Sequence, residues 1–167
     1  DLIEKHILAN MDFKPIIHKP IPMDRRIFLD EPMDLMSELM NLKLSERINY
    51  DPDRNILFAN LEGWSVRKKS DIDDLRIGLV AARIAAGRRV NSVVNHDGCR
   101  IADDLYDDYA ELIQYMAENH YLTTSRYSTS AFMRMKMQEA LTKRGLAPHI
   151  FEGPDEVHDM MTTQSKK

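Results

Sequence analysis

The sequence has a single cysteine, Cys99, among its 167 residues. One cysteine cannot form a disulfide within the chain, which favours a reducing, cytoplasmic location. No apolar run approaches the ~20 residues that a membrane-spanning helix needs. The net charge of −4 also argues against a general nucleic-acid binder, because such proteins carry a basic face. We therefore expect a cytoplasmic protein that contacts neither membrane nor nucleic acid.

The motifs of common metal and catalytic sites are also missing. The six histidines are scattered, and no H-x-x-x-H or C-x-x-C spacing places two ligands on one face. No G-x-S-x-G elbow presents a serine nucleophile. Cys99 follows "HDG" near a predicted strand end, but no histidine and acid are placed beside it, so we expect a small, semi-buried residue. The sequence thus predicts no metal site and no resident cofactor.

The first 44 residues differ in character from the rest of the chain. Prolines at 15, 20, 22 and 32 favour an extended arm over regular structure. Asp30 is a plausible cap for a following helix that carries Leu35, Leu39 and Leu42 on one face. The chain begins at Asp1 without an initiator methionine, and we expect it to be a piece of a longer polypeptide.

Strand and helix patterns alternate from residue 45 onward. "RINYDPDRNILFANLEGW" predicts a hairpin, and Ser70 is expected to cap a helix that Gly87 ends. The further elements predicted are a strand at 90–95, a helix at 102–119, a strand at 121–128, a helix at 129–145 and a strand at 147–152. This order predicts an α/β fold with a mixed sheet of about five strands, whose parallel strands are joined by three crossover helices.

The stretch "RYSTSAFMRMKM" allows two interpretations. Arg126, Ser128, Thr129 and Ser130 could bind an anion, because hydroxyls, a guanidinium and free N–H groups would converge at a helix start. The simpler interpretation is that Thr129 or Ser130 only caps the helix. The three methionines at 133, 135 and 137 alternate around this helix, so at least one should face outward.

Two longer phrases resemble a known family. "RYSTSAFMRMKMQEALTKRGLAPHIFE", preceded by "VNHDGCRI", resembles the extreme C-terminal region of bacterial acyl-CoA:acetate/3-ketoacid CoA-transferases of the propionate CoA-transferase group. The arm "IEKHILANMDFKPII" with "MDRRIF" resembles the segment that closes the transferase body in the same group. The resemblance implies a catalytic glutamate upstream of Asp1, since neither Glu62 nor Glu152 stands in a matching motif. Coenzyme A would then be a substrate of the full protein, and this fragment would be inactive alone.

The β-β-α-β-α order is also similar to that of STAS domains in anti-sigma-factor antagonists and sulfate transporters. A phosphorylatable serine opens the helix after the central strand in those domains. Asp103 and Asp104 stand near that position here and make it a candidate STAS-type switch position. Acids that complement the dipole of the helix are the alternative, and the whole acidic run is most simply a solvated helix face.

These observations predict three segments and one function. Residues 1–44 would be the tail of a transferase body with its arm and helix, residues 45–153 a STAS-like domain, and residues 154–167 a polar, frayed tail. The expected function is a non-catalytic accessory domain of a CoA-transferase, acting in docking on the upstream catalytic body, homo-oligomer assembly or regulation. The alternative is a module that binds an anion, a nucleotide or a CoA phosphate.

Overall fold

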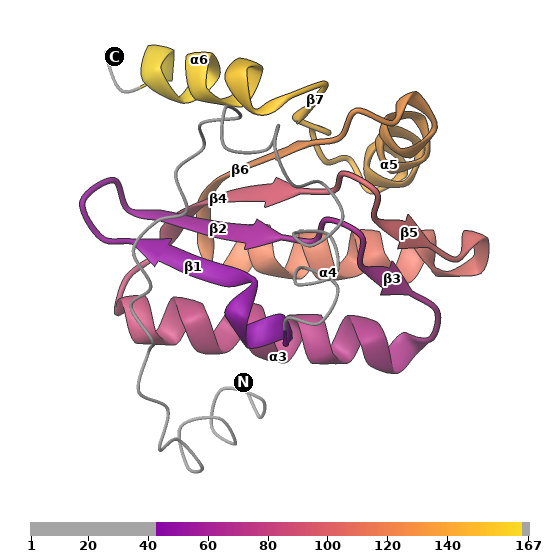
Figure 1. Cartoon of the computed structure of the whole chain (residues 1–167), viewed down its shortest axis with the longest axis horizontal. Helices are drawn as coiled ribbons and strands as arrows, with labels where there is room; N and C mark the ends of the chain where they lie inside the picture. Colours follow the sequence, from indigo (N-terminus) through magenta and orange to yellow (C-terminus); the bar gives the residue numbers. More distant parts are fainter. Residues whose placement is uncertain (1–42, 165–167) are drawn as a thin grey trace, which may run out of the picture.

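A computed structural model describes residues 43–164 of the chain (Figure 1). The predicted arm and the helix near residues 35–42 lie outside the described residues. The described elements are η2 (Leu44–Glu46), β1 (Ile48–Asp51), β2 (Ile56–Asn60), β3 (Ser65–Val66), α3 (Lys69–Ala86), β4 (Val90–Asn95), β5 (Arg100–Ile101), η3 (Asp103–Leu105), α4 (Tyr106–Asn119), β6 (Tyr121–Tyr127), α5 (Ala131–Lys143), β7 (Ile150–Phe151) and α6 (Pro154–Gln164). Within this part of the chain, no helix combines the length and apolarity that crossing a bilayer requires.

The five main strands form one mixed sheet in the order β1-β2-β4-β6-β7. β1 and β2 are antiparallel, and the other neighbours are parallel, so the predicted mixed α/β fold is confirmed. A second, two-stranded parallel sheet joins β3 to β5 and was not predicted. Its strands have only two residues each, which is too short for a period to be visible in the sequence.

Local chemistry explains the first elements. The hairpin turn is held by the Asp51 carboxylate, which accepts hydrogen bonds from the backbone N–H groups of Asp53 and Arg54. α3 begins at Lys69, slightly earlier than predicted, because the Asp71 carboxylate accepts from the N–H of Lys68. The helix ends at Gly87, as predicted, where a φ of 71° requires the left-handed region.

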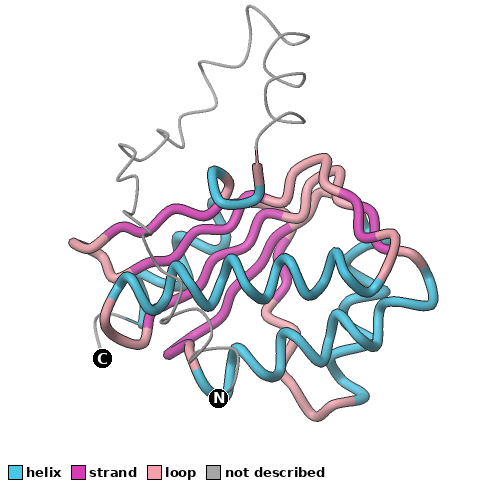
Figure 2. The backbone as a smooth tube through the Cα atoms, turned by 90° about the horizontal axis from the view of Figure 1, so that it is seen from below, coloured by secondary structure: helices cyan, strands magenta, loops and turns pink. Residues whose placement is uncertain are grey.

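The helices lie on both faces of the sheet. Figure 2 shows α3 and α4 side by side across one face, and the largest fully buried apolar side chains of the core lie here, among them Leu57, Leu75, Leu112 and Met116. α5 packs beside α4, and α6 lies on the opposite face (Figure 1). The prediction of a frayed tail from residue 154 is wrong for Pro154–Gln164: this segment is helical because Val157 is buried against Val93 and Tyr127.

β6 has two irregularities that matter for the site. Tyr121 pairs with Val90 and Thr123 pairs with Asn91, which leaves Leu122 as an extra residue in the strand. On the other edge of β6, the short β7 pairs only with the last two residues of the strand. The first half of β6 therefore borders an edge that β7 does not cover.

Candidate functional site

The carboxyl ends of the parallel strands gather a group of polar side chains. Asn60 and Asn95 end β2 and β4, and Glu62, Asp97 and Thr129 follow the ends of β2, β4 and β6. We call these five residues the carboxyl-edge cluster. Open α/β sheets bind ligands at this edge, so the cluster is the first candidate for a functional site.

Hydrogen bonds link the asparagines and Glu62 directly. The Asn95 amide donates to Asn60 Oδ1 at 3.0 Å and to Glu62 Oε2 at 3.3 Å. Asn60 Oδ1 also accepts from the backbone N–H of Glu62, and Asn95 Oδ1 accepts from that of Asp97. The polar atoms of β2 and β4 thus bond one another.

The Asp97 carboxylate occupies the start of α5. Its Oδ1 accepts from the backbone N–H of Thr129 at 2.6 Å and from the Thr129 hydroxyl at 2.9 Å. Ser130 Oγ accepts from the N–H of Met133, so the predicted capping of this helix is confirmed with Ser130 as the cap. Ser128 Oγ accepts from the N–H of Ser130 and is fully buried. The Ser128 hydroxyl and the N–H and hydroxyl of Thr129, which were predicted to hold an external anion, are therefore bonded within the protein.

Arg126 is separate from this helix start. Its side chain is only 2% exposed, and Nη1 donates to the backbone carbonyl oxygen of Pro148. Arg134, which the sequence interpretation left out, bonds the helix start and donates to the carbonyls of Ser128 and Thr129. The predicted convergence of Arg126 with Ser128, Thr129 and Ser130 is wrong, because its guanidinium points toward the chain before β7.

Arg126 borders an open cavity of about 280 Å³. α4 contributes Ile113 and Ala117 to the wall, and β6 contributes the residues from Tyr121 to Thr124. The chain before β7 contributes Leu146 and His149, and α6 contributes Met160. Arg126 also lines a smaller cavity of about 30 Å³ between the sheet and the two core helices, so its guanidinium lies between a cavity in the core and one at the sheet edge.

Burial sets the ionisation of the groups around these sites. Burial, followed by the nearby Asp97 carboxylate, raises the pKa of Glu62. Burial, followed by the Arg126 charge, lowers the pKa of His96 to about 3, and the Nε2 of this histidine lies 2.8 Å from the Tyr109 hydroxyl. Burial raises the pKa of the Cys99 thiol to about 12, so at neutral pH this cysteine is a buried thiol rather than a nucleophile.

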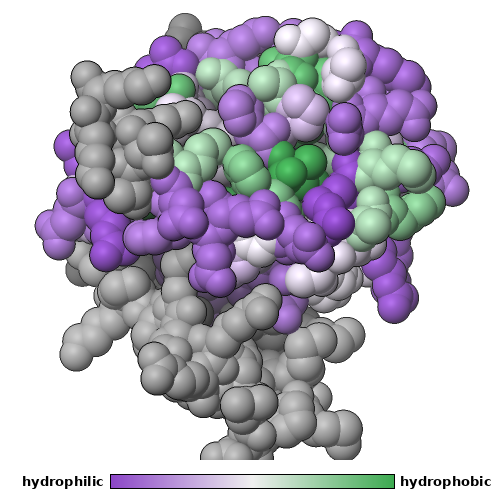
Figure 3. Space-filling view, turned by 90° about the horizontal axis from the view of Figure 1, so that it is seen from above, coloured by the Kyte–Doolittle hydropathy of each residue, from purple (hydrophilic) through white to green (hydrophobic). Residues whose placement is uncertain are grey.

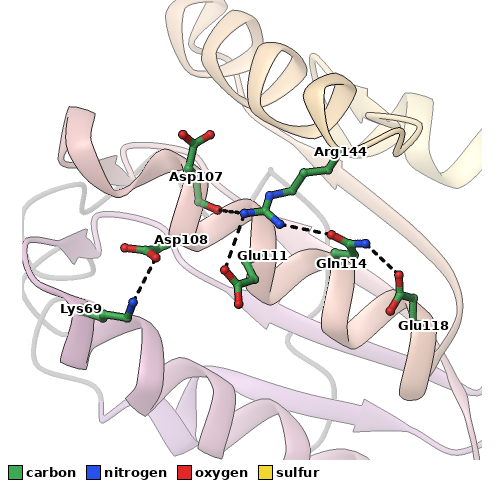
Figure 4. A network of polar contacts seen from close by, with 7 residues as sticks. All are labelled: Lys69, Asp107, Asp108, Glu111, Gln114, Glu118 and Arg144. Carbon is green, nitrogen blue, oxygen red and sulfur yellow. Dashed lines mark hydrogen bonds and ion pairs between the residues drawn. The ribbon is translucent and has the colours of Figure 1, made fainter.

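The acidic run of α4 is tied to neighbouring helices. Figure 4 shows Arg144, at the end of α5, between the Glu111 carboxylate at 3.6 Å and the Gln114 side chain at 3.3 Å. Lys69 of α3 pairs with Asp108 at 3.2 Å. The run is therefore a solvated face that also connects three helices.

The candidate switch position lies at the surface. Asp103 and Asp104 form the exposed start of η3, ahead of α4. Asp103 lies 4.0 Å from Lys136 of α5, and its side chain is 82% exposed. Nothing in the contacts of these two residues distinguishes a switch from acids at a helix start.

Comparison with protein-family models, with curated proteins and with solved structures finds no match to this chain. Within residues 43–164, no three histidine, cysteine or acidic side chains are grouped to hold a metal ion. The site must therefore be interpreted from its own contacts.

Sequence reasoning found the capping serine and missed two features. Glu62 was interpreted as a strand-end residue before a turn, yet it belongs to the carboxyl-edge cluster. The two asparagines that end parallel strands were the available signal, because such ends meet at one edge. The cavity beside Arg126 had no signal in the sequence, since α4, β6, the chain before β7 and α6 each supply part of its wall and only the fold brings these segments together.

Proposed function

We propose that this chain is a non-catalytic, cytoplasmic accessory domain of a CoA-transferase and that it acts by docking on the catalytic body of the same polypeptide. The resemblance of the two long phrases to the propionate CoA-transferase group supports the family. The carboxyl-edge cluster supports the absence of catalysis in the described part of the chain, because its donors and acceptors are bonded to one another and the Cys99 thiol is buried.

The observation that carries the docking role is a pair of exposed apolar side chains on the outer face of α5. Met133 and Met137 of this helix are buried in the core, and the exposure of Met135 confirms the prediction that at least one of the three methionines faces outward. Phe132 and Met135, three residues apart on the opposite face, are 57% and 56% exposed. Two large apolar side chains exposed next to each other at the start of a helix mark a surface that a partner can cover. Figure 3 shows further hydrophobic residues grouped among hydrophilic ones on the face seen from the side of α6.

The test uses this chain and a separately expressed CoA-transferase body of the propionate CoA-transferase group. We expect the two to bind in isothermal titration and the chain alone to show no CoA exchange between an acyl-CoA and a carboxylate. The double variant F132E/M135E should weaken binding by about tenfold or more, since a charge would replace buried apolar contacts. Ile77→Glu is the matched control, because Ile77 is an exposed apolar residue on a different helix.

Three results would contradict the proposal. Equal loss of affinity in the double variant and in Ile77→Glu would show that α5 is not the contact. Turnover of an acyl-CoA by the purified chain would show that the chain is an enzyme in its own right. Absence of a CoA-transferase body from the polypeptide that contains this chain would remove the family assignment.

A ligand-binding role is the second candidate. The observation that favours it is the buried guanidinium of Arg126 beside an open cavity. It is no longer favoured at the start of α5, where Asp97 already bonds the donors.

A further inference from the structure

Arg126 is a buried cation that has no acidic partner among residues 43–164. It is only 2% exposed, and no carboxylate within residues 43–164 forms an ion pair with it. Its one side-chain hydrogen bond in this part of the chain runs from Nη1 to the carbonyl oxygen of Pro148, and its Nε is buried without an acceptor. Charged side chains are rarely buried unless they are paired, because removing a charge from water is costly. An arginine in this state is incomplete without a further acceptor.

The cavity beside Arg126 has space for such an acceptor. Its volume of about 280 Å³ corresponds to roughly nine water molecules, and hence to a ligand of about ten non-hydrogen atoms. The cavity lies at the sheet edge that the short β7 leaves uncovered, so a ligand can enter from solvent. Arg126, whose buried Nε lacks an acceptor among the described residues, is also one of the residues that line this space.

The lining of the cavity selects among anions. Ile113, Ala117, Leu146 and Met160 provide apolar surface, and Arg126 is the one arginine or lysine among the lining residues. A phosphate would leave several charged oxygens against apolar walls without donors. A carboxylate presents two oxygens that match the planar fork of a guanidinium, and a hydrocarbon body would cover the apolar wall.

We propose that this cavity binds an amphipathic monocarboxylate of about ten non-hydrogen atoms, with the carboxylate on the Arg126 guanidinium and the apolar body against Ile113, Leu146 and Met160. The proposal rests on the cavity and on the unpaired cation, and it stands whether or not the chain belongs to a CoA-transferase. His149 and Thr124 also line the cavity.

The experiment is a methyl and amide NMR titration of the whole 167-residue chain with hexanoate. We expect saturable shifts at Ile113, Leu146 and Met160 and contacts from the hexanoate methyl group to these side chains. Hexanamide, which has the same shape without the charge, and inorganic phosphate, which has the charge without the apolar body, should each bind at least about tenfold more weakly, as the loss of a charge-assisted hydrogen bond or of apolar burial predicts.

Three variants locate the site. Arg126→Met should abolish the shifts, and Arg126→Lys should weaken binding because an ammonium lacks the planar fork. Ala117→Phe should block the cavity without altering the cation. Arg54→Gln is the matched control, because the Arg54 side chain is 71% exposed and distant in sequence from every lining residue.

The proposal is overturned if hexanamide binds as well as hexanoate, or if the shifts lie outside the cavity. It is equally overturned if folded Arg126→Met retains hexanoate binding. Should that variant fail to fold, Ala117→Phe decides the question, since retained affinity in it would place the ligand elsewhere.

Discussion

The carboxyl-edge cluster and the Arg126 cavity differ in whether their buried polar groups have hydrogen-bond partners. In the cluster, each amide or carboxylate meets a partner from a neighbouring strand or from the start of α5. Beside the cavity, a guanidinium retains a donor without an acceptor. At the carboxyl edge, where α/β proteins most often bind ligands, the polar groups are thus bonded to one another, whereas the ligand site that we propose lies at the sheet edge beside Arg126.

The largest expected effect concerns His96, which adjoins both regions. In the folded protein the pKa of His96 is about 3, whereas in the unfolded chain it is about 6.5. Between these two pH values the unfolded chain binds a proton at His96 and the folded protein does not. Stability from this residue is complete above pH 6.5 and is lost as the pH falls toward 3, by about 3 kcal/mol at pH 4. Urea unfolding between pH 7 and 4 should show this loss, and His96→Gln should flatten the dependence. If the free energy of unfolding of His96→Gln depended on pH as steeply as that of the wild type, the loss could not be assigned to His96.

The second effect tests the closure of the cluster. Asp97→Ala removes the acceptor of two Thr129 donors and should lower the free energy of unfolding by about 2 kcal/mol, the range for hydrogen bonds to a charged group. Chemical denaturation at neutral pH measures it. A double-mutant cycle with Thr129→Val should show coupling between the two side chains. Additive losses would indicate that the carboxylate stabilises the fold by some other contact.

The third effect has the opposite sign. Arg126→Met removes an unpaired buried cation and places an apolar side chain between the two cavities. We expect the free energy of unfolding to rise by about 1 kcal/mol in the absence of ligand, as in other replacements of buried charge. Thermal and urea unfolding without added carboxylate provide the measurement. If the free energy of unfolding of Arg126→Met fell instead by about 2 kcal/mol or more, the range for losing hydrogen bonds to a charged group, the protein itself would be satisfying the guanidinium.

The smallest effect isolates the hydroxyl cap from the carboxylate beside it. Ser130→Ala should lower the free energy of unfolding by about 1 kcal/mol or less, because one N–H of α5 loses its acceptor while Asp97 keeps its bonds. Gln138→Ala, an exposed position on the same helix, serves as the control for helix propensity. Equal changes in the two variants would remove the case for capping.

Long elements with a regular period were predictable and short or long-range features were not. α3 could be identified because Ile72, Leu75 and Leu79 recur at helical spacing and Gly87 ends the run. α6 was missed because one buried residue, Val157, secures a segment that is otherwise mostly polar. β3 and β5 exist only as each other's partners, and neither has a local signal.

The sequence predicted which residue caps the helix at the candidate site, but it did not predict which residues from other segments contact that site. Ser130 could be predicted as a cap from its place before an apolar helix. That Asp97, more than 30 positions away, would supply the anion for the same helix start depends on the parallel pairing of β4 with β6. Likewise, the carbonyl of Pro148 that receives Arg126 is brought there by the return of the chain to β7.

The extra residue in β6 allows Tyr121 to share a face of the sheet with Arg126. Residues on a regular strand share a face only when an even number of positions separates them. Tyr121 and Arg126 are five positions apart, yet both line the cavity beneath α3 and α4, because Leu122 adds one residue to the count. Deleting Leu122 would leave the two residues four positions apart in a regularly paired strand, and this even separation would keep both on the same face. The bulge therefore compensates for an odd count of residues, so that β6 can be one residue longer than β4 requires without separating the tyrosine from the cation.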